Sequence, residues 1–381
     1  MTGHLIEGGV AADVRAGLDG VASGLFARLA IKSAAEHEEN PESALAALKA
    51  TRATAMLIPA QCGGAGVSAS DAVRFQLALG AMAPSVAIAT TMHHYKIAAL
   101  GNVAAAGVAH AQVVLKDIAQ GSKLIASGGA ESTPGRDLRT LGSWAVRDAD
   151  AYLVTGLKRP CSLSTSMDML SLMVELRAPD GSPEGYAQAF VEAGADGVQR
   201  EPFWRSPVFL AAQSHAVRLS GVRVRGDHVF PLRGETGLRF ASDCYAWFQL
   251  LISASYLGIA RCLAEATAPA RRADSRGWTT AVARLRRLAA VLVDAARAVD
   301  DRRPVREQLN LAVQARDQVE DEVSALGGRL LRAAGGGSFA GTGFYTALAG
   351  GLNAIAFHPP QRGSREGIGL ELLDPESRDK D

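Results

Sequence analysis

Hydrophobic and polar positions follow three successive patterns along the chain. Up to about residue 115, and again from about residue 233, apolar residues recur every three or four positions, as on one face of a helix. Between these parts, short runs rich in Val, Leu and Tyr alternate with turn residues, which is typical of strands and hairpins. The spacing predicts helices over 10–30, 44–54, 70–83, 241–266, 280–299 and 304–334.

These patterns predict an α+β protein with three domains. A chain of 381 residues is too long for one ordinary core and fits two or three packed domains. We expect an N-terminal helical domain over residues 1–115, a central β-barrel or β-sandwich domain over 116–232, and a C-terminal helical bundle over 233–381.

The composition narrows the classes of function. The formal net charge is +1, so no global field attracts nucleic acid or an anionic membrane surface. The N-terminal segment lacks the features of a signal peptide, and no uncharged apolar run has the length of a membrane span. The four cysteines show no metal-ligand spacing, which predicts free thiols in a reducing cytosol. We therefore expect a cytoplasmic protein with no nucleic-acid, membrane or metal partner.

Three segments resemble a known family. Residues 58–66 read IPAQCGGAG, like the loop VPEEYGGxG that precedes a helix in the acyl-CoA dehydrogenase superfamily. Residues 130–137 read AESTPGRD and occupy the place of the family's flavin-cradling loop TEPxAGSD, with the glutamate, glycine and aspartate kept. Residues 158–162, KRPCS, follow at the family's interval and resemble its KxWI[ST] strand. The order of helices, β-domain and helices is similar to the family's as well.

This resemblance implies a fold, a cofactor and an assembly. The expected fold is that of the acyl-CoA dehydrogenases, with a four-helix bundle as its C-terminal domain. The expected cofactor is FAD, or FMN in the monooxygenases that share the fold. A homotetramer or homodimer is expected, because the family shares its flavins across subunit interfaces.

The resemblance also assigns residues to the flavin. The segment that includes Ser127, Gly129 and Ala130 would face the ring, and Gly135 and Arg136 would lie at the pyrophosphate. Glycine lets the backbone approach a phosphate closely, and a guanidinium pairs well with it. The alternative is a polar turn with a solvated arginine.

Further flavin contacts are expected on the β-domain and on the C-terminal helices. Ser162 falls where the family places a hydroxyl beside the flavin N5 atom, although it can equally be an ordinary serine at a strand end. Arg332, ahead of Gly335 and Gly336, stands where the family uses a glutamine to reach the neighbouring subunit's flavin. Its alternative role is that of a cation at a helix C-terminus.

The position of the family's catalytic glutamate holds no carboxylate. The family's YEGT motif corresponds to 357–360, FHPP, and the alternative location on the first C-terminal helix falls near Phe248. His358 is one candidate for the acid or base, because an imidazole can titrate near neutrality. Glu366 is the other candidate. His93, His94, Tyr245 and Phe248 are candidates for the substrate pocket, although the two histidines also fit a helix face.

Three functions remain open on these grounds. The first is α,β-dehydrogenation of an acyl thioester whose acyl chain is carried on CoA or on a carrier protein. In this case the protein is a flavin-dependent oxidoreductase of a specialised pathway, with an electron-transfer partner. The second is a two-component monooxygenase that receives reduced flavin from a reductase and acts on a small molecule. The third is a non-catalytic, flavin-poor relative that serves as a binding module.

Overall fold

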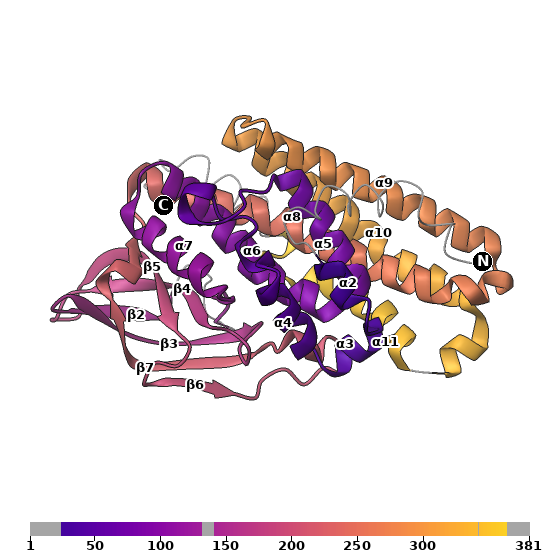
Figure 1. Ribbon diagram of the computed structural model, residues 1–381, viewed down its shortest axis with the longest axis horizontal. Coiled ribbons are helices and arrows are strands. Elements are labelled where there is room, and N and C mark those ends of the chain that lie inside the picture. The colour runs from indigo at the N-terminus through magenta and orange to yellow at the C-terminus, as the bar shows by residue number, and fades with distance from the viewer. Residues whose placement is uncertain (1–23, 132–140, 342, 364–381) are drawn as a thin grey trace.

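Helices from both ends of the chain pack beside one β-sheet in the computed structural model, which describes residues 24–131, 141–341 and 343–363. In Figure 1 the N-terminal helices, in indigo and purple, lie between the sheet and the orange C-terminal helices. All described strands fall between Ile125 and Pro231, with helices before and after them. The expected order of helices, strands and helices is therefore confirmed, and the protein is a mixed α/β structure.

The N-terminal helices begin where the sequence offers a cap. Ser33 and Glu36 form a capping box, in which each side chain bonds the other residue's backbone amide. The Ser68 hydroxyl accepts the Asp71 amide at the start of α5, at 3.1 Å. The helices are α2 (Leu25–Leu29), α3 (Ala34–Glu39), α4 (Glu42–Ala50), α5 (Ala69–Met82), α6 (Pro84–Ala105) and α7 (Ala109–Gly121), with the short turns η1 (Ala53–Ala55) and η2 (Ala60–Cys62) between α4 and α5.

The glycine-rich loop over residues 58–66 folds back tightly onto its own start. A Cβ at Gly64 would lie 2.2 Å from the carbonyl oxygen of Ile58, which leaves no room for a side chain. The Gly66 amide donates to the same Ile58 oxygen at 2.9 Å. Glycine at position 64 is thus required by a close backbone approach.

Eight strands form one sheet in the order β6-β7-β3-β2-β4-β5-β8, and β1 pairs with β4 off this path. The path ends at β6 and β8, which are not paired with each other among the described residues, so the sheet is open and the predicted barrel is not confirmed. Alternating hydrophobicity predicts strands, but closure depends on which distant edges pair. The strands are β1 (Ile125–Gly128), β2 (Trp144–Asp148), β3 (Ala151–Cys161), β4 (Met169–Arg177), β5 (Pro183–Glu192), β6 (Val198–Glu201), β7 (His215–Arg225) and β8 (Val229–Pro231).

Long helices make up the C-terminal part. Helical geometry in α10 breaks at Gly335, whose φ is 76°, directly after the predicted end of this helix at residue 334. The turn η6 then ends at His358. The elements are α8 (Gly234–Thr267), η5 (Ala268–Ala273), α9 (Ser275–Asp300), α10 (Val305–Ala340), α11 (Gly343–Gly351) and η6 (Leu352–Phe357), and η3 (Leu210–Ala212) and η4 (Gly226–His228) precede them within the β-region.

Helix α8 runs through the centre of the helical part and packs against α5, α6 and α10. Among the described residues, Gly234–Arg271 is the one helix that is long and apolar enough to cross a membrane, but 89% of its most apolar window is buried inside the protein. It approaches α5 through two glycines. A Cβ at Gly80 would lie 2.6 Å from the Ser255 oxygen, and one at Gly258 would lie 2.4 Å from the Leu77 oxygen. The two backbones are in contact there.

We predict that Gly258→Ala lowers the free energy of unfolding by about 2 kcal/mol, because the added methyl overpacks the α5–α8 contact. Urea denaturation measures this change. Gly328→Ala on α10 is the matched control, since the nearest atom to its Cβ would be Nη1 of Arg332 at 3.7 Å. The control is expected to be neutral or to stabilise by up to about 1 kcal/mol. Equal effects of both substitutions would contradict the prediction.

Candidate active site

A line of polar and aromatic side chains runs from the first strand to the turn after η6. The Ser127 hydroxyl on β1 lies 2.5 Å from the Tyr95 hydroxyl on α6. The Tyr95 ring packs edge-on against Phe248 of α8 with 5.3 Å between centroids, and Phe248 packs against the ring of His358 at 6.3 Å. The Tyr256 hydroxyl, also on α8, lies 2.9 Å from Nε2 of His358. The line forms only where N-terminal, central and C-terminal parts meet.

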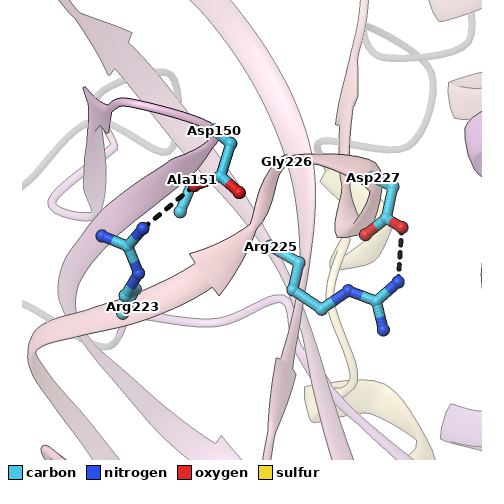
Figure 2. Close-up of a pocket in the computed structure, with 6 residues that line it drawn as sticks. All are labelled: Asp150, Ala151, Arg223, Arg225, Gly226 and Asp227. Atoms are coloured by element: carbon cyan, nitrogen blue, oxygen red, sulfur yellow. Dashed lines mark hydrogen bonds and ion pairs between the residues drawn. The ribbon is translucent and has the colours of Figure 1, made fainter.

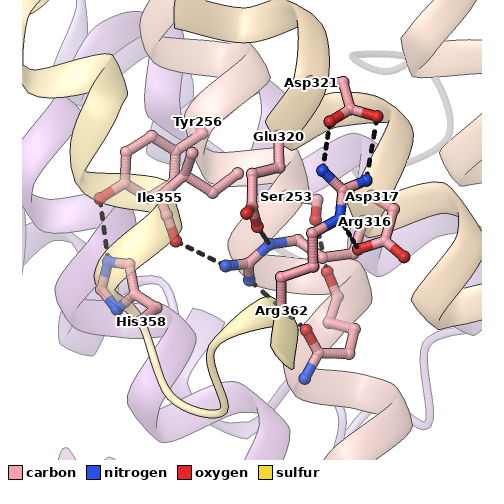
Figure 3. Close-up of polar contacts among 10 residues, drawn as sticks. Ser253, Tyr256, Arg316, Asp317, Glu320, Asp321, Ile355, His358 and Arg362 are labelled. Carbon is pink, nitrogen blue, oxygen red and sulfur yellow. Dashed lines mark hydrogen bonds and ion pairs between the residues drawn. The ribbon is translucent and has the colours of Figure 1, made fainter. Parts of the chain in front are cut away.

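The imidazole of His358 faces the Tyr256 hydroxyl (Figure 3). Burial, followed by the Arg316 guanidinium, lowers the pKa of His358 to about 3. Burial raises the pKa of Tyr256. Burial and a neighbouring cation both disfavour the imidazolium form, and the role of His358 as the acid or base stays a prediction. The two side chains share a hydrogen bond.

The two tyrosines of this line were missed by the sequence reasoning. Tyr95 and Tyr256 lie within apolar helical runs, where the periodicity indicates core positions. Their exposed fractions are 9% and 0%. A buried tyrosine hydroxyl needs a hydrogen-bond partner, and this requirement is the signal that could have marked them.

Two strand ends lie beside the line. The Cys161 thiol at the end of β3 donates to the Ser127 carbonyl oxygen, 3.8 Å away, so β1 and β3 end close together. The Ser162 hydroxyl lies 2.9 Å from that of Ser214. Gly129 is exposed, and among the described residues a Cβ built there would have one atom within 4 Å, the Ser127 Oγ at 3.9 Å. Hydroxyl groups and an accessible stretch of backbone therefore stand together at this edge.

A buried ion pair fixes the chain that follows β1. The Ala130 carbonyl accepts a backbone amide of β3 at 2.9 Å. Glu131 bonds Nζ of the buried Lys158 at 2.5 Å, the Gly142 amide at 2.5 Å and the Ser143 hydroxyl at 2.9 Å. Burial opposes ionisation of Glu131, but Lys158 and the other two donors outweigh it and hold the pKa of Glu131 below its usual range. The glutamate of the flavin-loop motif thus ties that loop to β3.

The two histidines of α6 lie in the core. Nδ1 of His93 accepts the Ile125 amide at 3.0 Å, and its Nε2 donates to the Thr54 oxygen at 2.6 Å. Nδ1 of His94 lies 3.3 Å from the Gln76 side-chain oxygen. Burial lowers the pKa of His93 to about 4 and that of His94 to about 3. His93 therefore attaches the start of β1 to the N-terminal helices.

The remaining candidates lie in three places. Tyr245 is buried on α8, about one turn before Phe248. Arg332 is exposed near the end of α10, close to Gly335 and Gly336, and the contact with a neighbouring subunit's flavin stays a prediction. Three further candidates, Gly135, Arg136 and Glu366, lie outside the described part of the chain.

Similarity to a known enzyme identifies the family. The chain is 32% identical over 338 residues to the isobutylamine N-hydroxylase of Streptomyces viridifaciens, an alignment that covers 86% of this chain and 88% of that protein. The chain belongs to the acyl-CoA dehydrogenase superfamily of flavin-dependent enzymes. No family model matches the chain.

Solved structures have the same fold as this flavoenzyme. FMN-bound TdsC from Paenibacillus sp. A11-2 has a TM-score of 0.78 at 19% identity, over 93% of this chain and 96% of that one. XiaF from Streptomyces sp., in complex with FADH2 and glycerol, has a TM-score of 0.75 at 18% identity, over 95% and 96%. The nitrososynthase from Micromonospora carbonacea var. africana has a TM-score of 0.77 at 18% identity, over 97% and 98%. The flavoenzyme is a flavin-dependent oxidoreductase, and its cofactor is FAD or FMN.

The strand ends of the flavoenzyme fit such a cofactor. A flavin ring needs hydrogen-bond donors for its nitrogen and oxygen atoms and an apolar slot for its faces. Ser127 and Ser162 offer hydroxyl groups, and the open backbone at Gly129 allows close approach of a flat ring. Tyr95 and Phe248 supply aromatic surface next to Ser127.

A separate pocket at the other end of the sheet does not belong to this site. Figure 2 shows it between the β2–β3 turn and the end of β7. Its arginines are paired within the pocket wall, Arg223 with Asp150 at 3.0 Å and Arg225 with Asp227 at 2.5 Å. The 11 residues of β3 separate it from Ser162, a length of about 33 Å for an extended strand.

One group of side chains has the composition of a metal site. Asp117, Glu192 and His228 place ligand atoms within 4.8 Å of one another. Nζ of Lys123 lies 2.8 Å from Asp117 and 3.0 Å from Glu192. The lysine therefore already supplies the positive charge that the two carboxylates require.

We predict that Glu131→Gln destabilises the protein by about 3 kcal/mol at pH 7, because it leaves the Lys158 charge buried without its partner. The pKa of Glu131 is lower in the folded than in the unfolded protein. Its contribution is thus fully present above the unfolded value of about 4.3 and is lost as the pH falls through the folded value. Urea denaturation between pH 3 and 7 measures the difference. The double variant Glu131→Gln/Lys158→Met should recover most of the loss, and a double variant as unstable as the single one would contradict the account.

Proposed function

We propose that this flavoenzyme is the oxygenase component of a two-component monooxygenase that hydroxylates the nitrogen of a small primary aliphatic amine. The observation that carries the proposal is the 32% identity over 338 residues to an isobutylamine N-hydroxylase. A His358–Tyr256 pair near the flavin-facing strands, where a dehydrogenase would hold its carboxylate, supports it. A separate flavin reductase is the partner that this arrangement requires.

The overall reaction balances with one equivalent of reduced flavin. Dioxygen gives one oxygen atom to an N–H bond of the amine and the other to water, and reduced flavin supplies two electrons and two protons. The products are the N-alkylhydroxylamine, water and oxidised flavin. Bound in the site, the reduced flavin supplies the electrons that activate oxygen.

The residues of the line divide the remaining tasks. Ser127 and Ser162 hold and orient the ring through their hydroxyl groups. Phe248 provides apolar surface against which a short alkyl chain packs and from which water is excluded. His358 and Tyr256 form the hydrogen-bonding end of the site, where the amine nitrogen is oriented and where a proton is passed on during oxygen transfer.

Thioester dehydrogenation fits this site less well. Removal of an α-proton needs a base within reach of that carbon, and the line from Ser127 to His358 contains no carboxylate among its described residues. The membership in an enzyme family likewise gives no support to a purely non-catalytic binding module.

The test uses the full-length protein with a flavin reductase, NADH or NADPH, and flavin. Isobutylamine and its straight-chain homologues are offered under ¹⁸O-labelled dioxygen, and the products are analysed by mass spectrometry. We expect hydroxylamines that carry one labelled oxygen atom. Butyryl-CoA is offered in two parallel reactions, one under the same conditions and one without oxygen. Anaerobic bleaching of enzyme-bound flavin by the thioester, with no hydroxylamine from any amine, would overturn the proposal in favour of dehydrogenation.

We predict that His358→Gln lowers hydroxylamine formation at least 100-fold while flavin binding is kept, because acid–base groups of this kind contribute about 10²–10⁴-fold. Product yield and a fluorescence titration with flavin measure the two properties. His110→Gln, a half-buried histidine at the start of α7, is the matched control and is expected to retain activity. Unchanged product yield in His358→Gln would remove the imidazole from the reaction.

A further inference from the structure

Lys96 of α6 is a half-buried cation next to the line of polar and aromatic side chains. Its Nζ lies 3.3 Å from the Gln188 side-chain oxygen and 3.9 Å from the Cys244 sulfur. It also stands over the rings of Tyr95 and Phe240, at 5.2 Å and 5.3 Å from their centroids. These contacts are made with an amide, a thiol and two aromatic rings, which hold an ammonium group without cancelling its charge.

No carboxylate of the described residues pairs with Lys96. Asp243 of α8, the residue before Cys244, accepts from Arg239 at 2.8 Å and from Asn102 at 3.0 Å. Burial acts to lower the pKa of Lys96, but the neighbouring thiol and phenol outweigh it and raise the pKa above its ordinary value. The side chain is thus an ammonium group whose counter-ion is not found among the described side chains.

Two paths of contacts join Lys96 to the strand end that is expected to face the flavin. On the first path, the hydroxyl of the adjacent Tyr95 lies 2.5 Å from that of Ser127. On the second, the buried Gln188 directs its oxygen to Lys96 and donates its amide to Ser171 of β4 at 2.9 Å. Ser171 is the register partner of Ser127, so the two serines point to the same face of the sheet. Lys96 and Ser127 therefore belong to one region between α6 and the sheet.

A flavin brings negative charge to this region, whereas a short alkylamine does not. The ring of oxidised flavin is neutral, but reduced flavin loses a proton near neutrality and then carries a negative charge on its N1 and O2 side. The phosphate groups are charged in both redox states. A cation beside the ring therefore stabilises reduced flavin over oxidised flavin, and a cation at a phosphate does not distinguish the two.

On the basis of the proposed function, we propose that Lys96 makes the site selective for reduced flavin by placing its positive charge beside the ring at Ser127. Gln188, which is held by Ser171, keeps the ammonium group directed at this strand end. The oxygenase component of a two-component enzyme takes up reduced flavin from its reductase and releases oxidised flavin. A charge that binds one redox state more tightly than the other serves both steps.

The first experiment measures the affinity of the wild-type protein for flavin in each redox state, without amine and without oxygen. Equilibrium dialysis under anaerobic conditions is carried out with FMN and with FAD, each oxidised or reduced with dithionite. We expect the reduced form of the more tightly bound flavin to bind at least about tenfold more tightly than its oxidised form, the scale of a unit charge acting over roughly 8 Å at an effective dielectric constant of about 20. Equal affinities for the two states would overturn the proposal.

Two substitutions separate the charge of Lys96 from its packing. Lys96→Met keeps a long unbranched side chain without the charge, so the preference for reduced flavin should fall about tenfold through weaker binding of the reduced form. The midpoint potential of the bound flavin should then fall by about 30 mV, which corresponds to a tenfold change for a two-electron couple. Lys96→Arg keeps the charge and should keep most of the preference. Lys116→Met, at an exposed lysine of α7, is the matched control and should bind both forms like the wild type.

Riboflavin, which has the ring but no phosphate, shows which part of the flavin meets the charge. Its preference for the reduced state should fall in Lys96→Met as that of the phosphorylated flavin does. Equal weakening of oxidised and reduced FMN, with riboflavin unaffected, would place Lys96 at the phosphate and overturn the proposal. An unchanged redox preference in Lys96→Met, together with a lost preference for amines that carry a carboxylate, would assign the charge to the substrate instead.

The outcome is separable from folding and from the proposed function. Where Lys96→Met does not fold, Lys96→Gln removes the charge and keeps a polar end, and an unchanged preference in that variant overturns the proposal as well. Hydroxylamine formation by a wild type without redox preference contradicts this inference alone. Absence of hydroxylamine from every amine, with a preference that depends on Lys96, contradicts the proposed function alone.

Discussion

The position of α8 is the constraint on which the rest of the structure depends. This helix is packed against α5 at backbone contact, through Gly80 and Gly258, and it also packs against α6 and α10. It carries Phe248 and Tyr256, the two aromatic residues that contact His358. Because protein interiors are close-packed, a shift of α8 along α5 would move both rings relative to β1 and to the C-terminal turn. The active-site line is therefore a consequence of helix packing more than of any loop.

Electrostatics differ at the two ends of the line, and this difference follows from how each buried cation is paired. After β1, the buried Lys158 has Glu131 at 2.5 Å, and the pair holds Glu131 against β3. Behind His358, the Arg316 guanidinium pairs with Glu320 at 3.3 Å and donates its shortest hydrogen bond to the Ile355 carbonyl oxygen. The first pair anchors the residue that follows β1, and the second holds the turn that carries His358 through the Ile355 carbonyl. Burial and then the Arg316 guanidinium lower the pKa of the imidazole beyond that turn.

Much of the fold could be predicted from local sequence. Helix periodicity, a serine cap before α5 and the strand pattern of the central part each act over a few residues, and the structure follows them. The openness of the sheet could not be predicted, because the pairing of β6 and β8 depends on contacts between distant segments. The importance of Tyr95 and Tyr256 was hidden as well, since a tyrosine in an apolar helix has the same periodicity whether it lies in the core or at a site. His93 shows the reverse case. It was a candidate for the substrate pocket, and its ring bonds the Ile125 amide and so attaches β1 to the N-terminal helices.

The replacement of a carboxylate by an imidazole is consistent with the different reaction that we propose for this dehydrogenase-like fold. A fold constrains where a flavin and a substrate meet, while the side chains at that place decide the chemistry. A glutamate base is suited to removing a proton from carbon, and it would also bind an ammonium ion and keep its nitrogen lone pair occupied. The imidazole of His358, which is bonded to Tyr256 and whose pKa burial lowers, differs from such a carboxylate in both respects. Under the proposed function, the same position orients an amine nitrogen and does not remove a proton from carbon.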